Sequence, residues 1–193
     1  NISVFYKYRN LVSLDDQMTQ SDFAKKIQKD KYILLSAVNS SYITTNSDST
    51  TDISTITTYI ENYNEKSSNK NIKVFYILLI YPGTDCESKR ANMMKFVNHI
   101  RYPKAEIMII TATKISNSVV KGLTALSYTK EHKNHTFSAY TYILLNTIIP
   151  EFELAPTYEI LNETDAQEYD TDILPKIFEN DPQMVWIGAT VGQ

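Results

Sequence analysis

The chain has 193 residues, 42% of them hydrophobic, and a formal charge of −3 at neutral pH. This length suits one domain, or one domain with a small appendage, and fourteen Tyr and seven Phe supply much of the material for a core. A net charge so near zero excludes binding of nucleic acid or membrane by overall electrostatics, so any DNA contact must be local. The single cysteine, Cys86, excludes an internal disulfide and favours a reducing compartment.

The apolar segments are too short for a membrane-spanning protein. The longest run, from Ile72 to Tyr81, has about ten residues, whereas a spanning helix needs roughly 20. Polar and basic side chains at positions 6–9 interrupt the apolar start of the chain, which argues against a secretory signal. We therefore expect a soluble intracellular protein.

The first forty residues carry helix signals followed by a strand. Apolar residues recur at spacings of three and four over residues 3–14, which predicts a helix there. A second helix is predicted over 19–32, with Ser21 as its N-cap and Asp22 in its first turn. The continuous apolar run at 31–38 then predicts a strand.

From residue 72 onward the pattern is that of an α/β domain. Residues 72–81 and 105–113 are rich in β-branched and aromatic residues without alternation, which predicts strands covered on both faces. A helix that ends before Pro103 is predicted between them, and another at 114–127. Residues 135–149 supply more strand-like sequence. This succession predicts a βαβ core with right-handed crossovers.

Composition divides the chain into two domains. Residues 39–71 are rich in Ser, Thr, Asn and Asp, which favour turns over a packed core, so we expect a polar insertion there. Four of the six prolines, at positions 150, 156, 175 and 182, fall in the last forty-four residues and predict a compact, turn-rich module. The predicted domains are therefore 1–145, with the insertion at 39–71, and 146–193.

The C-terminal stretch contains short phrases in a distinctive order. They are IPEFELAP (149–156), LPKI (174–177), DP (181–182), WIG (186–188) and GQ (192–193). In this order and spacing they resemble the assembly domain of the fifth shared subunit of eukaryotic-type RNA polymerases, a family that has an archaeal counterpart. Upstream, YKYRNLV at 6–12 is similar to the opening helix of that family. ATKISNSVVKGL at 112–123 is similar to the strand-to-helix turn of its jaw domain.

The resemblance implies an α/β N-terminal jaw domain, with a βαβ core and helices on a mixed sheet, and a small α+β C-terminal assembly domain. It implies a non-catalytic subunit of a multi-subunit DNA-dependent RNA polymerase, acting in transcription without a cofactor, a metal or a small-molecule substrate of its own. The jaw would lie near downstream duplex DNA, and the assembly domain would dock on the largest polymerase subunit among the other subunits. The residues that the resemblance assigns to docking are Leu154, Pro156, Leu174, Pro175, Ile177, Asp181, Pro182, Trp186 and Gly188.

The sequence also departs from the family. Thr190 and Val191 replace a basic pair, and the family's turn proline is absent at 114–116. The family continues past its Gly-Gln phrase into a terminal hairpin, so we expect the assembly domain here to be incomplete and to expose Trp186 and Ile187 unless a partner covers them. The Trp before the glycine and the abundance of Asn, Ile, Lys and Tyr resemble copies carried by large DNA viruses. A viral copy would act in the virion or host cytoplasm, and a cellular one in the nucleus.

Basic residues beside two predicted turns are candidates for contact with DNA. If the strands at 72–81 and 105–113 are parallel, both turns lie at the same edge of the sheet. Helix N-termini and nearby cations can hold backbone phosphates without reading base sequence. The contact would be weak and salt-sensitive, and the alternative is that these lysines only solvate the surface. The residues at the two turns are Pro82, Gly83, Lys89, Arg90, Lys114 and Lys121.

No catalytic constellation is found in the sequence. Its four glycines form no phosphate-cradling loop, and Glu131, His132 and His135 lie in a polar segment typical of a solvated loop. A restriction-type nuclease needs an Asp and a Glu-x-Lys on adjacent strand positions. Glu87-Ser88-Lys89 sits at a predicted helix start, and Glu106 heads a strand without a Lys two positions later. The alternative hypotheses are a nuclease-fold DNA-binding or repair protein independent of polymerase, and a pure interaction scaffold.

Overall fold

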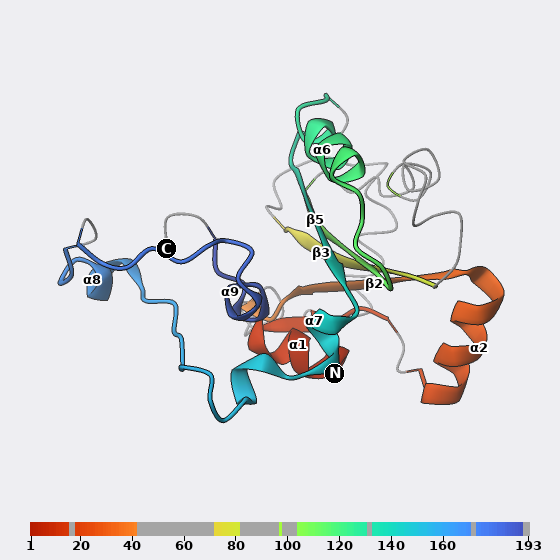
Figure 1. The fold of residues 1–193 in the computed structure, drawn as a ribbon, viewed down its shortest axis with the longest axis horizontal. Helices are drawn as coiled ribbons and strands as arrows, with labels where there is room; N and C mark the ends of the chain where they lie inside the picture. The colour runs from red at the N-terminus through yellow and green to blue at the C-terminus, as the bar shows by residue number, and fades with distance from the viewer. Residues whose placement is uncertain are drawn as a thin grey trace, which may run out of the picture. The chain divides into compact units, whose positions relative to one another are not determined.

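The structure is a computed structural model in which two compact units are distinguished. The α/β unit spans Leu11–Ile143, and the terminal unit combines Asn1–Asn10 with Leu144–Gln193 (Figure 1). The helix predicted before Pro103, and nearly all of the predicted insertion, lie outside the residues that the structure describes. The described residues are 1–15, 18–41, 72–81, 97, 104–130, 133–170 and 173–190.

The α/β unit is built on a five-stranded mixed sheet with the strand order β1-β2-β3-β4-β5 (Figure 1). β1 and β2 pair antiparallel, as do β2 and β3, whereas β3, β4 and β5 are mutually parallel. The predicted α/β class with a mixed sheet is therefore confirmed. The strands are β1 (Leu11–Ser13), β2 (Tyr32–Asn39), β3 (Val74–Ile80), β4 (Ala105–Thr111) and β5 (His135–Thr141).

The core of this unit lies on the central strands. All seven residues of β3 are buried, and in β4 only Glu106 is partly exposed, as predicted from their unbroken apolar runs. Helix α6 (Asn117–Leu126) joins β4 to the parallel strand β5 and buries Val119 and Leu123 in the same hydrophobic cluster as Leu78 and Ile109. The segment β4-α6-β5 is thus a βαβ element, as the sequence predicts.

The N-terminal elements differ from the prediction in their bounds. Helix α1 (Ile2–Tyr8) stops well before residue 14, because Asn10 adopts a left-handed φ of 52° and the next residues pair with β2 as strand β1. Helix α2 (Gln20–Asp30) begins one residue after Thr19, which replaces the predicted Ser21 as N-cap. The Thr19 hydroxyl oxygen accepts a hydrogen bond from the Asp22 N–H at 3.2 Å.

The predicted strand material at 135–149 also ends early. β5 stops at Thr141 and is followed by helix α7 (Ile143–Asn146) and the short 3-10 helix η1 (Ile149–Glu151). The Asn1 side chain donates hydrogen bonds to the carbonyl oxygens of Leu145 and Asn146, at 2.7 and 3.2 Å. These carbonyls are thereby satisfied by a distant part of the chain, which no local sequence pattern reveals.

The Asp15 carboxylate links the end of β1 to β2 in the antiparallel half of the sheet. Asp15, just after β1, accepts hydrogen bonds from the backbone N–H of Ser36 at 2.5 Å and from its hydroxyl at 3.4 Å. Ser36 is the register partner of Tyr76 on β3. Burial, together with the negative charge of Asp15, raises the pKa of the Tyr76 hydroxyl to about 12. Tyr76 therefore stays protonated to a higher pH than an ordinary tyrosine, whose pKa is near 10.

Because the pKa of Tyr76 is raised, the free energy of unfolding should vary with pH in the alkaline range. An unfolded Tyr76 ionises near pH 10 while the folded one stays protonated, so the free energy of unfolding should fall as pH rises from about 10 to about 12. The slope for one group is about 1.4 kcal/mol per pH unit. Tyr76→Phe should flatten this part of the profile, measured by urea unfolding at a series of pH values. Tyr128→Phe, at a site that is 85% exposed, is the control, and an identical slope for wild type and Tyr76→Phe would contradict the assignment.

Candidate partner-docking surface

The terminal unit is organised around Trp186, the only tryptophan of the chain. Its indole is 0% exposed and its ring contacts Phe5 and Tyr8 of α1 edge to face, at centroid distances of 5.1 and 6.0 Å. The indole N–H donates a hydrogen bond to the Leu144 carbonyl oxygen at 2.9 Å. The helix α1 therefore belongs to the C-terminal module, and the predicted grouping of residues 1–10 with the α/β domain is not what the structure has.

Two of the family-like phrases lie at the ends of helix α9 (Pro182–Ile187). The DP phrase is at its start and the WIG phrase at its end. The Asp181 carboxylate accepts a hydrogen bond from the Gln183 N–H at 2.9 Å, and Pro182 occupies the first turn, where a missing N–H costs nothing. Gly188 ends the helix with a left-handed φ of 77°. A Cβ added at Gly188 would lie 2.9 Å from the end of the flexible Arg9 side chain, which can move, so backbone strain is what disfavours a larger residue there.

These positions correct one expectation from the sequence. The sequence predicts that Trp186 and Ile187 are exposed without a partner, but Trp186 is fully buried within the terminal unit and Ile187 is partly buried. The expectation is wrong because α1, far away in sequence, supplies the cover. Trp186 is thus a core residue and not part of a surface that a partner can touch.

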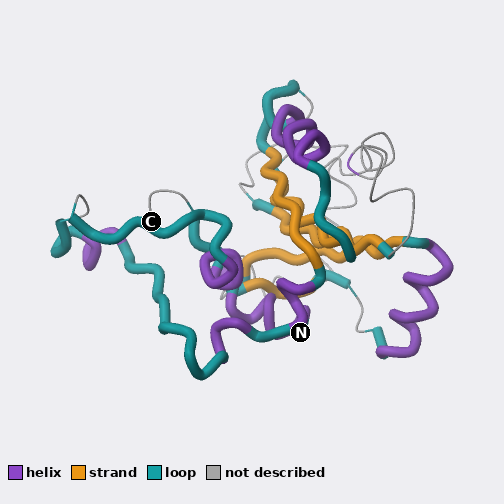
Figure 2. The backbone as a smooth tube through the Cα atoms, viewed as in Figure 1, coloured by secondary structure: helices purple, strands orange, loops and turns teal. Residues whose placement is uncertain are grey.

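The exposed apolar surface of the terminal unit lies instead on residues 152–179, here called the extended segment. Among its described residues the single turn α8 (Glu163–Ala166) is helical, and the others form loops and turns (Figure 2). Ten of the thirteen exposed large hydrophobic side chains in the described residues lie in it, including Leu154 at 83% and Phe178 at 82% exposure. The full set is Phe152, Leu154, Tyr158, Ile160, Leu161, Tyr169, Ile173, Leu174, Ile177 and Phe178.

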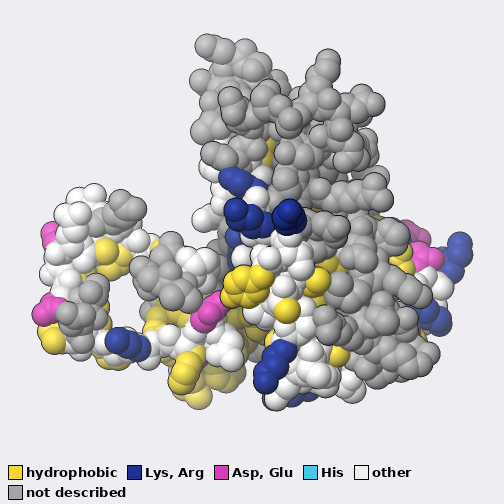
Figure 3. Space-filling view, turned by 90° about the horizontal axis from the view of Figure 1, so that it is seen from above, with side chains coloured by type: hydrophobic (Ala, Val, Ile, Leu, Met, Phe, Trp, Pro, Cys, Tyr) yellow, Lys and Arg dark blue, Asp and Glu magenta, His cyan; other side chains and the backbone are white. Residues whose placement is uncertain are grey.

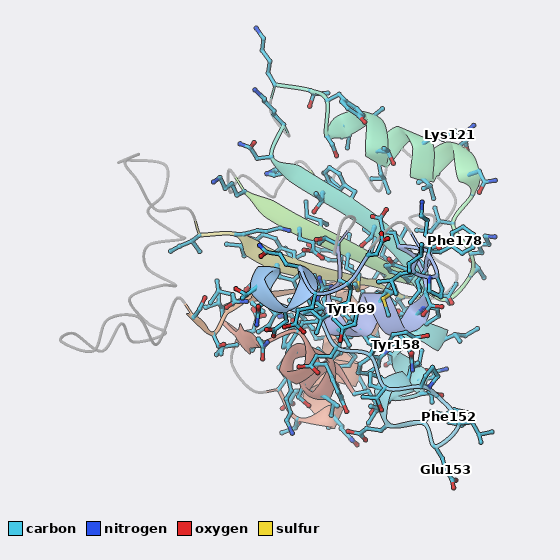
Figure 4. The ribbon with its side chains drawn as sticks, turned by 90° about the vertical axis from the view of Figure 1, so that its left-hand side faces the viewer. Lys121, Phe152, Glu153, Tyr158, Tyr169 and Phe178 are labelled. Carbon is cyan, nitrogen blue, oxygen red and sulfur yellow. The ribbon has the colours of Figure 1, made fainter. Side chains whose placement is uncertain are left out.

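Backbone contacts hold the extended segment in place while its side chains face outward. The Gln183 side chain, which is buried, donates to the Pro156 carbonyl oxygen at 3.0 Å. The Asn162 side chain accepts from the N–H groups of Thr164 and Asp165, at 3.0 and 2.9 Å, and so caps α8. Figure 4 shows Phe152 and Glu153 projecting outward from the turn that follows η1. The segment is therefore ordered by its own chain without burying its apolar side chains.

The extended segment is also strongly acidic. The terminal unit contains ten acidic and three basic residues, a formal charge of −7, while the α/β unit contains twelve acidic and sixteen basic residues, a formal charge of +4. Four exposed carboxylates of this segment form neither an ion pair nor a hydrogen bond with another described residue. They are those of Glu153, Glu159, Glu168 and Glu179. Figure 3 shows acidic and hydrophobic side chains interspersed on the left, where this segment lies.

Tyr8 and Glu151 connect α1 to the start of the extended segment. The Tyr8 hydroxyl donates to the Glu151 carboxylate at 3.3 Å. Burial, followed by the negative charge of Glu151 and this hydrogen bond, raises the pKa of Tyr8 above its ordinary value. Tyr8 therefore remains a neutral donor and packs against Trp186 at the same time.

The residues predicted to assist docking fall into two groups. Leu154, Leu174 and Ile177 are exposed on the extended segment, and Pro156 and Pro175 are exposed there too. The remaining four are structural parts of α9 and its ends: Asp181, Pro182, Trp186 and Gly188. All five residues of the first group are exposed, whereas in the second group only Pro182 is.

The predicted DNA-proximal residues are only partly described. Pro82, Gly83, Lys89 and Arg90 lie outside the described residues. β3 and β4 are parallel, so their carboxyl ends lie at one edge of the sheet, as the prediction requires. Lys114 follows β4 at that edge and precedes the N-cap of α6, Ser116, by two residues, and Lys121 is exposed on α6.

The histidine and carboxylate residues considered for a metal or nuclease site have structural roles wherever the structure describes them. His135 is buried at the start of β5, with its ring edge against Phe137, so the expectation that it lies in a solvated loop is wrong. Glu106 forms an ion pair with Lys73 at 2.9 Å. Among residues with a described placement, no group of three His, Cys, Asp or Glu side chains is positioned to hold a metal ion. Glu131 and His132 lie outside the described set.

Comparison with known protein families and with curated proteins finds no match for this chain. Within the described part of the chain, no helix has the length and apolar character needed to cross a membrane.

The packing of α1 on Trp186 predicts a local stability effect. Phe5→Ala removes a fully buried ring next to the indole, which should cost about 3–5 kcal/mol in the stability of the terminal unit. Because Trp186 is the only tryptophan, its fluorescence reports this unit alone, and its urea transition should move to lower concentration. Phe5→Leu, which keeps most of the volume, should move it less. An unshifted tryptophan transition in Phe5→Ala would show that α1 does not belong to this unit.

Proposed function

We propose that this protein is a non-catalytic subunit of a multi-subunit DNA-dependent RNA polymerase. In this proposal the extended segment docks on the largest subunit, and the α/β unit acts as a jaw near downstream DNA. The observation that carries the proposal is the extended segment itself. It concentrates most of the exposed large hydrophobic side chains of the described residues on a stretch whose phrases resemble an assembly domain.

Exposure of this kind supports a permanent partner. Folded monomers rarely leave many large apolar side chains together in water, since burying each one fully is worth about 1.5–3 kcal/mol. The terminal unit already has a core around Trp186, so the outward side chains of the extended segment are not needed for its internal packing. Interfaces of stable complexes bury this type of aromatic and aliphatic surface.

The distribution of charge supports separate roles for the two units. The α/β unit is net basic and the terminal unit is net acidic. A basic unit with exposed lysines near a helix N-terminus favours contact with backbone phosphates, whereas an acidic unit disfavours it. DNA contact is therefore proposed for the α/β unit through Lys114 and Lys121, with Lys89 and Arg90 as further candidates from the sequence. The contact would be weak and independent of base sequence.

The ion pair of Glu106 gives less support to the alternative of a nuclease-fold protein. That chemistry needs carboxylates that are free to hold Mg²⁺. Glu106, the carboxylate at the head of β4, is held by Lys73. The proposal therefore assigns the phosphodiester chemistry of transcription to other chains of the complex.

The docking proposal predicts a selective loss of binding. The triple change Leu154→Ser, Ile177→Ser and Phe178→Ser should weaken association with the purified polymerase core at least tenfold, because apolar contact area at the interface is lost. Binding is measured by surface capture of the tagged chain with polymerase that lacks this subunit. The matched control, Val120→Ser with Tyr128→Ser, removes exposed apolar side chains from the α/β unit and should bind normally. Tryptophan emission confirms that each variant keeps its terminal unit folded. Failure of the wild-type chain to bind polymerase would overturn the proposal.

The jaw proposal predicts an effect of charge on elongation complexes. Lys114→Glu with Lys121→Glu should shorten the lifetime of a stalled elongation complex at moderate salt, because contacts with DNA phosphates are lost. The slope of log affinity against log salt concentration should fall by about one unit for each lost contact. Lys25→Glu with Lys29→Glu, on exposed positions of α2, is the matched control for net charge. Equal lifetimes and salt dependence for the two pairs would rule out a DNA role for Lys114 and Lys121.

A further inference from the structure

We propose that the surface receiving the extended segment is apolar at its centre and lined by lysine and arginine side chains. The inference rests on the proposed function for the identity of the partner, the largest polymerase subunit. It concerns the chemistry of the contact, which the resemblance to a family does not supply. The relevant observation is how acidic and apolar side chains alternate along residues 152–179.

Each exposed, unpaired carboxylate has an exposed large apolar neighbour in sequence. Glu153 lies between Phe152 and Leu154, and Glu159 lies between Tyr158 and Ile160. The same pairing recurs twice later in the segment, as Glu168-Tyr169 and Phe178-Glu179. Neighbouring side chains of an extended backbone point to opposite sides. A partner that wraps around the segment and covers its apolar side chains therefore also meets the carboxylates between them.

Covering those carboxylates with an uncharged surface would be unfavourable. A carboxylate taken out of water without a cationic partner loses its hydration and gains nothing in return. The terminal unit has little basic charge to neutralise them, since Lys176 is the only basic residue after residue 143. Cations on the partner would form charge-assisted hydrogen bonds to the carboxylates and leave the apolar side chains to pack between them. The pattern therefore indicates a partner with an apolar centre and basic borders.

The negative charge of the terminal unit also disfavours other binding partners for this surface. A second copy docking through the same segment would bring two units of charge −7 together. Nucleic acid and anionic membrane surfaces would be repelled for the same reason. A head-to-tail contact with the basic α/β unit of another copy has the right charge, and crosslinking tests it directly.

A zero-length carbodiimide crosslinker tests the contact, because it joins a carboxylate only to an amine that already touches it. The full chain, tagged and purified from its source with whatever remains bound at moderate salt, is treated and analysed by peptide mass spectrometry. Crosslinks from Glu153, Glu159, Glu168 or Glu179 to lysines of the largest polymerase subunit support both proposals. Crosslinks to lysines of a different stoichiometric partner support the basic-bordered contact and overturn the polymerase assignment. Crosslinks only to another copy of this chain, or none at all, overturn the inference.

Association kinetics provide the second test. The quadruple change Glu153→Gln, Glu159→Gln, Glu168→Gln and Glu179→Gln should slow association with the purified partner about tenfold at low salt and flatten its salt dependence. The control changes three exposed lysines of α2 in the other unit, Lys25→Gln, Lys26→Gln and Lys29→Gln. It alters the overall charge of the chain but should leave the association rate nearly unchanged. The triple serine variant of the extended segment should instead speed dissociation. An unchanged association rate and salt dependence in the quadruple variant would overturn the inference.

Discussion

The burial of Trp186 is the interaction on which the terminal unit depends. Its indole contacts two rings of α1 and is fixed in orientation by the bond from its N–H to the Leu144 carbonyl oxygen. Aromatic contacts of this geometry add to the stabilisation from burial, and the hydrogen bond removes the cost of burying the indole N–H. Because this core does not use them, the apolar side chains of the extended segment face water.

The terminal unit therefore places core residues and exposed apolar residues within one short stretch. Asp181, Pro182 and Gly188 specify where α9 begins and ends, and Trp186 supplies its core contact. Leu154 and Ile177, which belong to phrases of the same family-like pattern, remain outside. A sequence motif of this kind mixes residues that cap a helix with residues that can contact a partner. Substitutions in the first set should be interpreted through folding, and those in the second through binding.

The central sheet could be predicted from the sequence for a physical reason. β3 and β4 are buried on both faces, so their unbroken apolar runs are a local signal that needs no knowledge of distant contacts. The sequence predicts Ser21 and not Thr19 as the N-cap of α2, because both residues are good caps and only the hydrogen bond to Asp22 distinguishes them. The end of α1 depends on the left-handed conformation of Asn10, which a helical periodicity cannot show.

The candidate site was predictable only in part. The resemblance of the phrases around Leu154 and Ile177 to an assembly domain predicts docking residues there, and both side chains are exposed. The cover over Trp186 could not be predicted, because α1 is far from it along the chain and the contact leaves no local pattern. The polar residues before His135 predict a loop there, although β5 begins at this residue.

The joining of α1 to a distant part of the chain has a consequence for biosynthesis. Asn1 is hydrogen-bonded to a residue 144 positions away, so residues 1–10 can complete their contacts only after the α/β unit has been translated. Until then Phe5 and Tyr8 have no indole to pack against, and α1 is too short to be stable alone. A nascent chain would therefore carry an unfinished hydrophobic segment while the α/β unit is being made. Chaperones that recognise short apolar stretches would find α1 available throughout that interval.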